Sequence, residues 1–256
     1  MEPMLEVIGV SKNFGGLPAA DHIDMRVLPG EVHGLIGPNG AGKTTLLNLI
    51  SGIYEVDAGK IILDGQEITH VPAHDRAKLG LARTFQAPRF LQRSSIRENI
   101  MVGMDLANKI GYVRSFFGCH GKVRDLTKEL TELMHIADFP IDWDDDIDSL
   151  SYGQRKLLEI VRALLTDPKV MLVDEPAAGL NSSEINKAMQ LMDYAANHGI
   201  GVVLIEHSMD MIMTICHNIT VISFGKVIGE GTPQEVSSNE AVIEAYLGRS
   251  KNAART

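Results

Sequence analysis

The chain has 256 residues, of which 45% are apolar and 22% are charged, so it can bury a substantial core and has an ordinary globular composition. The formal net charge of −9 argues against a nucleic-acid-binding protein, because such proteins usually carry a basic surplus. We expect no signal peptide and no membrane span, since no run of about 18 apolar residues occurs, and the two distant cysteines predict reduced thiols.

The first part of the chain reads mainly as strands. Apolar and polar residues alternate over 5–14 and 22–28, as they do in half-buried antiparallel strands. A short apolar strand at 31–37 then runs into a glycine-rich loop, and residues 43–53 have helical spacing. A further strand is predicted at 59–68. These patterns indicate an N-terminal antiparallel β subdomain beside the start of an α/β core.

Helical patterns dominate the middle of the chain. Residues 94–104, 123–137 and 154–167 have helical spacing, whereas 111–121 show no clear period. Strands and helices alternate after residue 165, which predicts an α/β fold with a mainly parallel sheet. We expect a single domain over 1–256, with a core formed by 1–87 and 166–240, an inserted α-helical subdomain at 88–165, and a C-terminal helix and polar tail at 241–256.

The glycine-rich loop GPNGAGKT, at 37–44, matches the phosphate-loop pattern G-x-x-x-x-G-K-[ST]. In such a loop, the glycines allow backbone N–H groups to close around a phosphate. Lys43 then neutralises β- and γ-oxygens, and the Thr44 hydroxyl ligates Mg²⁺. The predicted strand before the loop and the helix from its lysine favour this interpretation over an ordinary glycine turn.

Two carboxylates and a histidine end apolar strands. Asp174 at the end of VMLVDE is placed to complete a Mg²⁺ shell, and Glu175 to polarise an attacking water. The alternative is that these acids cap a following helix, since Pro176 comes next. His207 ends the strand in IEH, where a histidine can bond a γ-phosphate, although a lone histidine is often structural.

Two further residues have ambiguous roles on spacing alone. Gln86, in RTFQ, lies where the helical region begins, so it either links Mg²⁺ to movement or is a polar surface residue. Phe14 either stacks on a purine ring or belongs to a strand core.

The stretch LSYGQRK, at 150–156, places Ser151 and Gly153 directly before a helical run. A helix N-terminus with these residues is typical of an anion site, because backbone N–H groups and the helix dipole converge there. The chain therefore contains two anion-binding patterns, the phosphate loop at 37–44 and this stretch, although a single nucleotide needs only one.

The ordered set GPNGAGKT, RTFQ, LSYGQRK, VMLVDEP, AGLN and IEH resembles the ATP-binding cassette of ABC transporters over about residues 4–235. The resemblance implies a phosphate-loop NTPase core and two copies packed head to tail. Ser151 and Gly153 of one copy then contact the γ-phosphate of ATP held by the other, which explains the second anion pattern. AGLN, at 178–181, matches the loop that crosses the dimer interface.

The resemblance also implies a full set of site residues for ATP and Mg²⁺. Phe14 is the adenine-stacking aromatic, Glu175 the general base and His207 the switch histidine, with Lys43 also catalytic. Metal ligands are Thr44, Gln86 and Asp174. The other nucleotide contacts implied are Gly37, Pro38, Asn39, Gly40, Ala41, Gly42, Thr45, Ser151, Gly153, Gln154 and Asn181.

Two departures narrow the resemblance. Tyr152 replaces a second signature glycine, and Asn181 replaces the usual aspartate of the interface loop. Both are similar to the LivG-type ATP-binding subunits of branched-chain amino acid importers, as are SKNFGG, ARTFQ and EAYLG.

This branch implies an ATPase at the cytoplasmic face of the inner membrane. Its partners would be a second cassette ATPase, two permease subunits and, indirectly, an extracytoplasmic substrate-binding protein, with no nucleic acid. The permease groove is expected near residues 86–100. The alternatives are a soluble cassette ATPase of an assembly system, such as iron–sulfur cluster biogenesis, and a subunit that no longer hydrolyses ATP.

Overall fold

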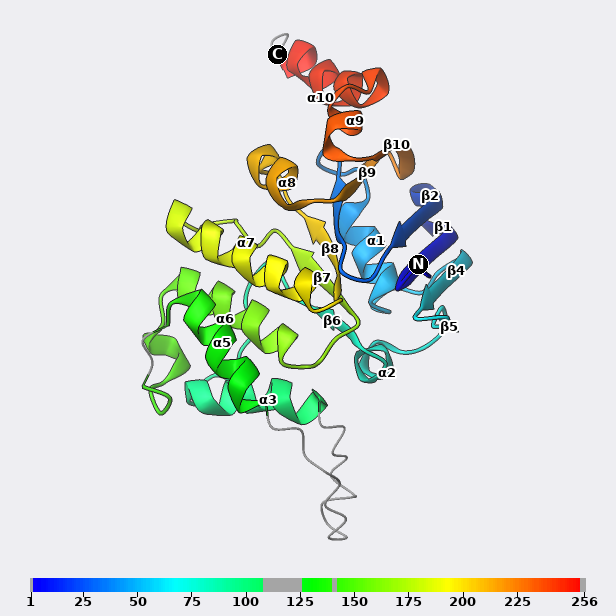
Figure 1. The fold of residues 1–256 in the computed structure, drawn as a ribbon. Coiled ribbons are helices and arrows are strands. Elements are labelled where there is room, and N and C mark those ends of the chain that lie inside the picture. Colours follow the sequence, from blue (N-terminus) through cyan, green and yellow to red (C-terminus); the bar gives the residue numbers. More distant parts are fainter. Residues whose placement is uncertain (1, 108–125, 140–141, 254–256) are drawn as a thin grey trace.

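The computed structural model describes residues 2–107, 126–139 and 142–253 (Figure 1). The aperiodic segment 111–121 and Cys119 lie outside these ranges. A six-stranded sheet occupies the centre, in the order β10-β9-β3-β8-β7-β6. Its strands run parallel except β10, which pairs antiparallel with β9. The strands are β3 (Val32–Ile36), β6 (Leu81–Arg83), β7 (Val170–Asp174), β8 (Gly201–Ile205), β9 (Asn218–Ser223) and β10 (Lys226–Gly231).

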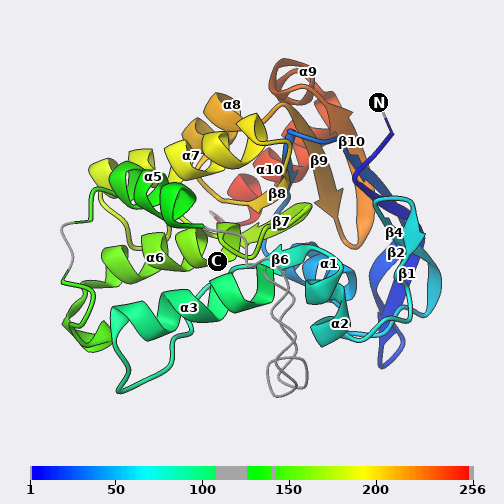
Figure 2. The same ribbon diagram turned by 60° about the horizontal axis from the view of Figure 1, so that its bottom comes forward.

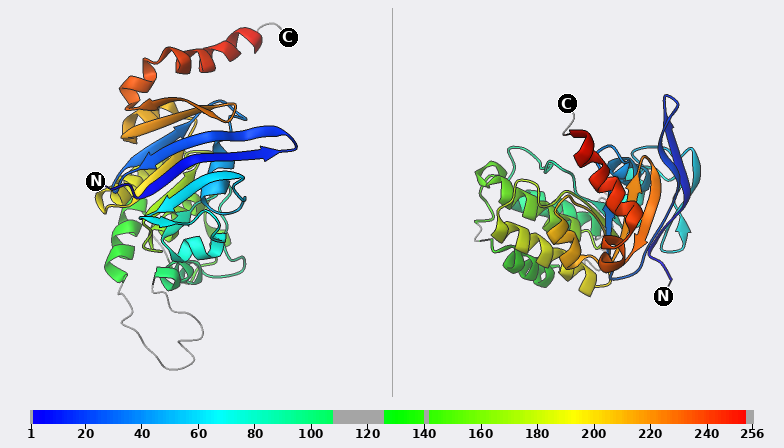
Figure 3. Two further views of the ribbon diagram at one scale, coloured as in Figure 1. Left: turned by 90° about the vertical axis from the view of Figure 1, so that its right-hand side faces the viewer. Right: turned by 90° about the horizontal axis from the view of Figure 1, so that it is seen from above.

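A smaller antiparallel sheet, β2-β1-β4-β5, stands beside the central one, and its long β1–β2 hairpin projects from the molecule (Figure 3). Its strands are β1 (Leu5–Phe14), β2 (Leu17–Val27), β4 (Ala58–Leu63) and β5 (Gln66–Glu67). The single strand expected at 59–68 is instead a hairpin. Asp64 and Gly65 both have positive φ, 48° and 72°, which turns the chain tightly there.

The predicted helices α3, α5 and α6 lie together on one side of the central sheet, as Figures 1 and 2 show. Their bounds are Ile96–Ala107, Thr127–Ala137 and Tyr152–Leu164, with a short 3₁₀ helix, η1, at Ile147–Ser149. The sequence reading missed the short helices α2 and α9. The remaining helices are α1 (Lys43–Ile50), α2 (Ala73–Lys78), α7 (Ser182–Asn197), α8 (Met209–Ile215), α9 (Pro233–Ser237) and α10 (Glu240–Ala253).

The central strands are covered on both faces, as their continuous apolar runs require. Leu204 packs into the apolar cluster that includes α6 and α7, whereas its neighbour Val203 packs into the cluster that includes α1 and the small sheet. Both side chains are fully buried. Since side chains alternate along a strand, the two clusters lie on opposite faces of the sheet. Among the described helices, none combines the length and apolarity that crossing a bilayer requires.

Candidate functional site

The phosphate-loop sequence connects β3 to α1 in a turn that requires glycine at two close approaches. Gly42, the N-cap of α1, has φ 108°, and a Cβ there would lie 2.3 Å from the carbonyl oxygen of Ala19. A Cβ on Gly37 would lie 2.1 Å from the carbonyl oxygen of Ile222. Within the described part of the chain, no side chain caps the N-terminus of α1. The loop therefore presents the helix end through backbone groups alone.

A pocket of about 330 Å³ opens on this loop. Its lining brings the phosphate loop together with Glu175 and His207, which lie 130 and more residues further along the chain. The Lys43 ammonium donates to the Gly37 and Pro38 carbonyl oxygens, at 2.7 and 3.1 Å. The lining residues are Ala19, Asn39, Gly40, Ala41, Gly42, Lys43, Thr44, Thr45, Glu175 and His207.

Glu175 lies at the centre of a hydrogen-bonded cluster at the end of β7. The Gln86 amide donates to its Oε2 at 2.9 Å, and the His207 Nε2 lies 3.1 Å from its Oε1. Glu175 itself has φ 49°, a left-handed conformation that non-glycine residues seldom adopt. Such strain is held by the surroundings and concentrates at functional sites.

Asp174 is buried directly beside Glu175. Its Oδ2 lies 3.6 Å from the guanidinium of Arg83, and its backbone N–H donates to the Thr84 hydroxyl at 3.4 Å. Burial raises the pKa of the Asp174 carboxyl, while the positive charge of Arg83 opposes that change and Glu175 adds to it. A carboxylate desolvated in this way is stabilised by a nearby cation.

Two buried charged residues that the sequence reading missed hold the main chain around this cluster. The Lys156 ammonium, on α6, donates to the Glu175 carbonyl oxygen at 2.6 Å. The Glu206 carboxylate accepts from the backbone N–H groups of Ala177 and His207, at 2.8 and 2.7 Å. The segment IEH, in which Glu206 directly follows a buried apolar strand, contains a sequence signal for this residue. Nothing in the local sequence distinguishes Lys156 from an exposed helical lysine.

The signature stretch begins α6. The Ser151 hydroxyl accepts from the Gln154 backbone N–H at 3.2 Å, and the Gln154 side chain accepts from the Ser151 N–H at 2.9 Å. Gly153 packs so closely that a Cβ would lie 2.1 Å from the Glu184 carboxylate. Glu184 is in turn the capping partner of Asn181 at the start of α7. The signature and the AGLN loop are thus interlocked within one chain.

Nine predicted site residues are not among the described residues that line the phosphate-loop pocket: Phe14, Gly37, Pro38, Gln86, Ser151, Gly153, Gln154, Asp174 and Asn181. Gly37 and Pro38 nevertheless bond to Lys43, Gln86 bonds to Glu175, and Asp174 is next to Glu175 in the chain. Phe14 ends β1 and is 43% exposed. Its ring meets the ring of Tyr54 edge to face, with centroids 5.3 Å apart. The structure therefore gathers the loop, Gln86, Asp174, Glu175 and His207, and leaves the signature residues on another surface.

The fold and the pocket define a class of protein. Residues 20–178 match the family model described as "ABC transporter", and the chain belongs to this family of cassette ATPases. Residues 226–251 match a second model, described as "Branched-chain amino acid ATP-binding cassette transporter".

Individual relatives narrow the class to one branch. The chain is 36% identical to BraF of Pseudomonas aeruginosa, a high-affinity branched-chain amino acid transport ATP-binding protein, with 96% of this chain and 98% of BraF covered. It is 34% identical to LivG of Escherichia coli K12, which carries the same description, over the same shares. The ADP conformation of MJ1267, an ATP-binding cassette of an ABC transporter, is similar in fold, with a TM-score of 0.81, 29% identity, and 97% and 100% of the two chains covered.

Proposed function

We propose that this chain is the ATP-hydrolysing subunit of an importer for branched-chain or related amino acids. The observation that carries the proposal is the position of Glu175, whose carboxylate lies between Gln86 and His207 in the pocket of the phosphate loop. The match at 226–251 and the names of BraF and LivG support the amino-acid class. They also favour import over an assembly ATPase such as one for iron–sulfur clusters.

The pocket fits a nucleoside triphosphate. Gly40 has φ 78° and open space where a Cβ would project, and the first turn of α1 offers backbone N–H groups and a positive dipole end. We assign the triphosphate to 37–45, and the adenine to the exposed ring of Phe14, which Tyr54 steadies. Gly37, Pro38 and Ala41 shape the loop, while Asn39, Gly40, Gly42, Lys43, Thr44 and Thr45 face the phosphates.

The donor set also fits Mg²⁺, which prefers oxygen ligands and usually shares them with phosphates. Thr44 contributes a hydroxyl, Gln86 an amide oxygen and Asp174 a buried carboxylate. When bound, Mg²⁺ would supply positive charge that offsets the negative charge of the phosphates. The burial of Asp174, which raises the pKa of its carboxyl, supports the assignment, because a desolvated carboxylate is stabilised by a nearby cation.

We assign proton transfer to Glu175. Gln86 and His207, which bond to the Glu175 carboxylate, orient it. In the general-base role, the Glu175 carboxylate accepts a proton from the attacking water. Gln86 and His207 occupy both carboxylate oxygens in this structure, so each must exchange its bond when water and the γ-phosphate enter. His207 then orients the γ-phosphate, and Lys43 neutralises its oxygens.

A head-to-tail dimer accounts for the residues outside the pocket. Ser151, Gly153 and Gln154 lie at the N-terminus of α6, where the dipole favours an anion. In the dimer, this end covers the nucleotide of the partner subunit, and Asn181 lies in the loop at the interface. ATP stabilises only the closed dimer through these contacts, so it shifts the equilibrium toward closure.

The remaining partners follow from transport. A chain of this kind pairs with a second cassette, the same or related, and with two permease subunits at the cytoplasmic face of the membrane. A substrate-binding protein outside the membrane supplies the amino acid. The groove for the permease lies near residues 86–100, which join β6 to α3.

Two measurements test the proposal. Glu175→Gln in the purified chain should lower the ATPase rate about a hundredfold or more and prolong ATP-dependent dimers, because it removes the general base. An unchanged rate would contradict hydrolysis at this site.

Affinity purification from gently solubilised host membranes should recover two multispanning permeases and a second cassette. Recovery of soluble scaffold proteins alone would contradict import.

A further inference from the structure

The buried lysine on the signature helix connects two parts of the proposed mechanism. Lys156 is one turn into α6, whose N-cap is Ser151, yet Lys156 is only 3% exposed and its ammonium bonds to the main chain of Glu175. We propose that Lys156 is a positioning residue that fixes Glu175 and ties it to the helix whose N-terminus contacts the partner subunit's nucleotide. The proposal rests on the function proposed above for Glu175 and Ser151.

The bond from Lys156 stabilises a strained part of the backbone, the left-handed main chain of Glu175. Glu175 is in the left-handed region, and its main-chain groups make three hydrogen bonds. Its N–H donates to the Ile205 carbonyl oxygen on β8, at 2.9 Å, and its own carbonyl oxygen accepts from Lys156 at 2.6 Å. The carbonyl oxygen also accepts from the Ala178 N–H at 3.3 Å, so without Lys156 this side of the residue keeps only the longer bond, and its carboxylate is less well aimed.

The charge of Lys156 is balanced by the groups around it. Burial lowers the pKa of its ammonium, and the carboxylates of Glu206, Glu159, Glu175 and Asp174 oppose that change. The ammonium also lies 5.8 Å from the centre of the Tyr152 ring. A charged donor surrounded by carboxylates makes a stronger bond to a carbonyl than a neutral one does.

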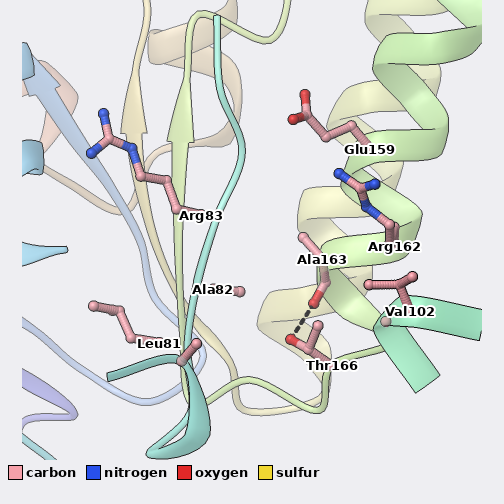
Figure 4. Close-up of a pocket in the computed structure, with 10 residues that line it drawn as sticks. Leu81, Ala82, Arg83, Val102, Glu159, Arg162, Ala163 and Thr166 are labelled. Carbon is pink, nitrogen blue, oxygen red and sulfur yellow. Dashed lines mark hydrogen bonds between the residues drawn. The ribbon is translucent and has the colours of Figure 1, made fainter. Parts of the chain in front are cut away.

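The same face of α6 also holds the glutamine loop. Glu159, 3% exposed, accepts from the Phe85 backbone N–H at 3.3 Å, one residue before Gln86. Arg162 donates to the Arg89 carbonyl oxygen at 2.6 Å. Figure 4 shows Glu159 and Arg162 on α6, across a pocket of about 290 Å³ from Leu81 and Arg83 on β6.

Residues 156, 159 and 162 follow the spacing of one helix face, so their contacts move together with α6. Through them, α6 reaches both the main chain of Glu175 and the loop that carries Gln86. A displacement of the Ser151 end by the partner subunit's nucleotide is thereby transmitted to the residues that aim the general base. Lys156 is the direct contact in this link.

The test compares Lys156→Met with Lys156→Arg in the purified full-length chain. For Lys156→Met, we expect kcat for ATP hydrolysis to fall at least tenfold, with KM and the dissociation constant of a fluorescent ATP analogue within twofold of wild type. Lys156→Arg, which keeps a charged donor, should restore kcat to within about threefold. Lys187→Met is the matched control, because Lys187 is a salt-bridged lysine on α7 that pairs with Asp138 at 2.8 Å.

A second measurement does not depend on activity. Amide hydrogen exchange in peptides covering 172–178 should rise in Lys156→Met and not in Lys187→Met, because one anchor of Glu175 is lost. If Lys156→Met does not fold, Lys156→Gln takes its place with the same expectations. An unchanged kcat, an equal change in kcat and KM, or unchanged exchange in 172–178 would overturn the proposal. Failure of the proposed function itself is seen separately, as a wild-type chain that does not hydrolyse ATP.

Discussion

Two helix N-termini in this molecule are assigned to phosphate, and they are built differently. The end of α1 begins with Gly42 and, within the described residues, has no side-chain cap. The end of α6 has a complete capping box, in which Ser151 and Gln154 satisfy each other's backbone N–H groups. At the first end, no side-chain cap stands between the backbone and a nucleotide. The second has an internal partner, which a nucleotide must displace or share.

This difference assigns ATP binding by one subunit to the end of α1 and closure of the dimer to the end of α6. An end that is ready in the monomer suits the subunit's own ATP, and an end that is already satisfied suits a contact made only when a second subunit brings its ATP. The capped end leaves the isolated chain with no free-energy penalty for unpaired polar groups, because the capping box satisfies the N–H groups of Ser151 and Gln154. Three substitutions test this comparison.

The largest effect is expected for Gly42→Ala at the uncapped end. The new Cβ meets the Ala19 carbonyl oxygen at 2.3 Å on a backbone with φ 108°. If strain of about 3 kcal/mol falls on the loop, ATP affinity drops about a hundredfold, as titration of the monomer with a fluorescent analogue would measure. Gly65→Ala is the control, since Gly65 also has positive φ but open space around its Cβ position. Equal affinities for the two variants would contradict the close approach.

A smaller effect is expected for Ser151→Ala at the capped end. Hydrolysis should fall about tenfold, while ATP affinity of the monomer stays within twofold, and thermal unfolding should show a loss of about 1 kcal/mol from the missing cap. Thr232→Ala is the matched control, because Thr232 caps α9 in a capping box of the same kind. Should the control lower hydrolysis equally, or should monomer affinity fall with hydrolysis, the cross-subunit assignment of Ser151 would be wrong.

The third substitution, Glu159→Gln, is expected to change stability rather than activity. Burial raises the pKa of Glu159 to about 7, against the positive charges of Arg162 and Lys156 and the N–H groups of the glutamine loop. The folded state therefore binds more protons than the unfolded state between about pH 4.5 and 7, so this group's contribution to stability falls as the pH rises through that window. Wild type should lose about 2–3 kcal/mol from this group by pH 8.

Glu159→Gln removes that titration and should be more stable than wild type at pH 8, while retaining an oxygen for the Phe85 N–H. Chemical denaturation at pH 5 and pH 8 measures the difference. The exposed Glu132 on α5 provides the control, Glu132→Gln, which should leave the difference unchanged. A wild-type pH dependence equal to that of Glu159→Gln would show that Glu159 does not titrate in this range.

The comparison also explains which parts of the site could be predicted. The phosphate loop and Glu175 can be predicted because local sequence determines them. A glycine pattern makes a turn, and an acid after an apolar run ends a buried strand. The mainly parallel sheet follows from the same alternation of strands and helices. The hairpin of β4 and β5 was also predictable, because Asp64-Gly65 is a dipeptide that favours such a turn, but the single-strand prediction did not take it into account.

Lys156 and Glu159 could not be predicted, because their burial depends on which face of α6 meets the core. Their spacing suits a solvated helix face equally well, and only the packing of α6 beside β6 and β7 makes them internal. For Phe14, by contrast, the role was predicted but the structure does not test it. The structure places it against Tyr54, but its part in adenine binding stays a prediction.

The contact between Gly153 and Glu184 changes how a mutational scan of this protein should be interpreted. A Cβ at 153 requires the Glu184 carboxylate to move from its position as the cap of α7, so a substitution there acts on the single chain before a nucleotide is involved. Loss of transport in a Gly153 variant is therefore not evidence of a phosphate contact. Shortening Glu184 in the same chain relieves the collision, and only the deficit that survives such a second-site change reports on the nucleotide.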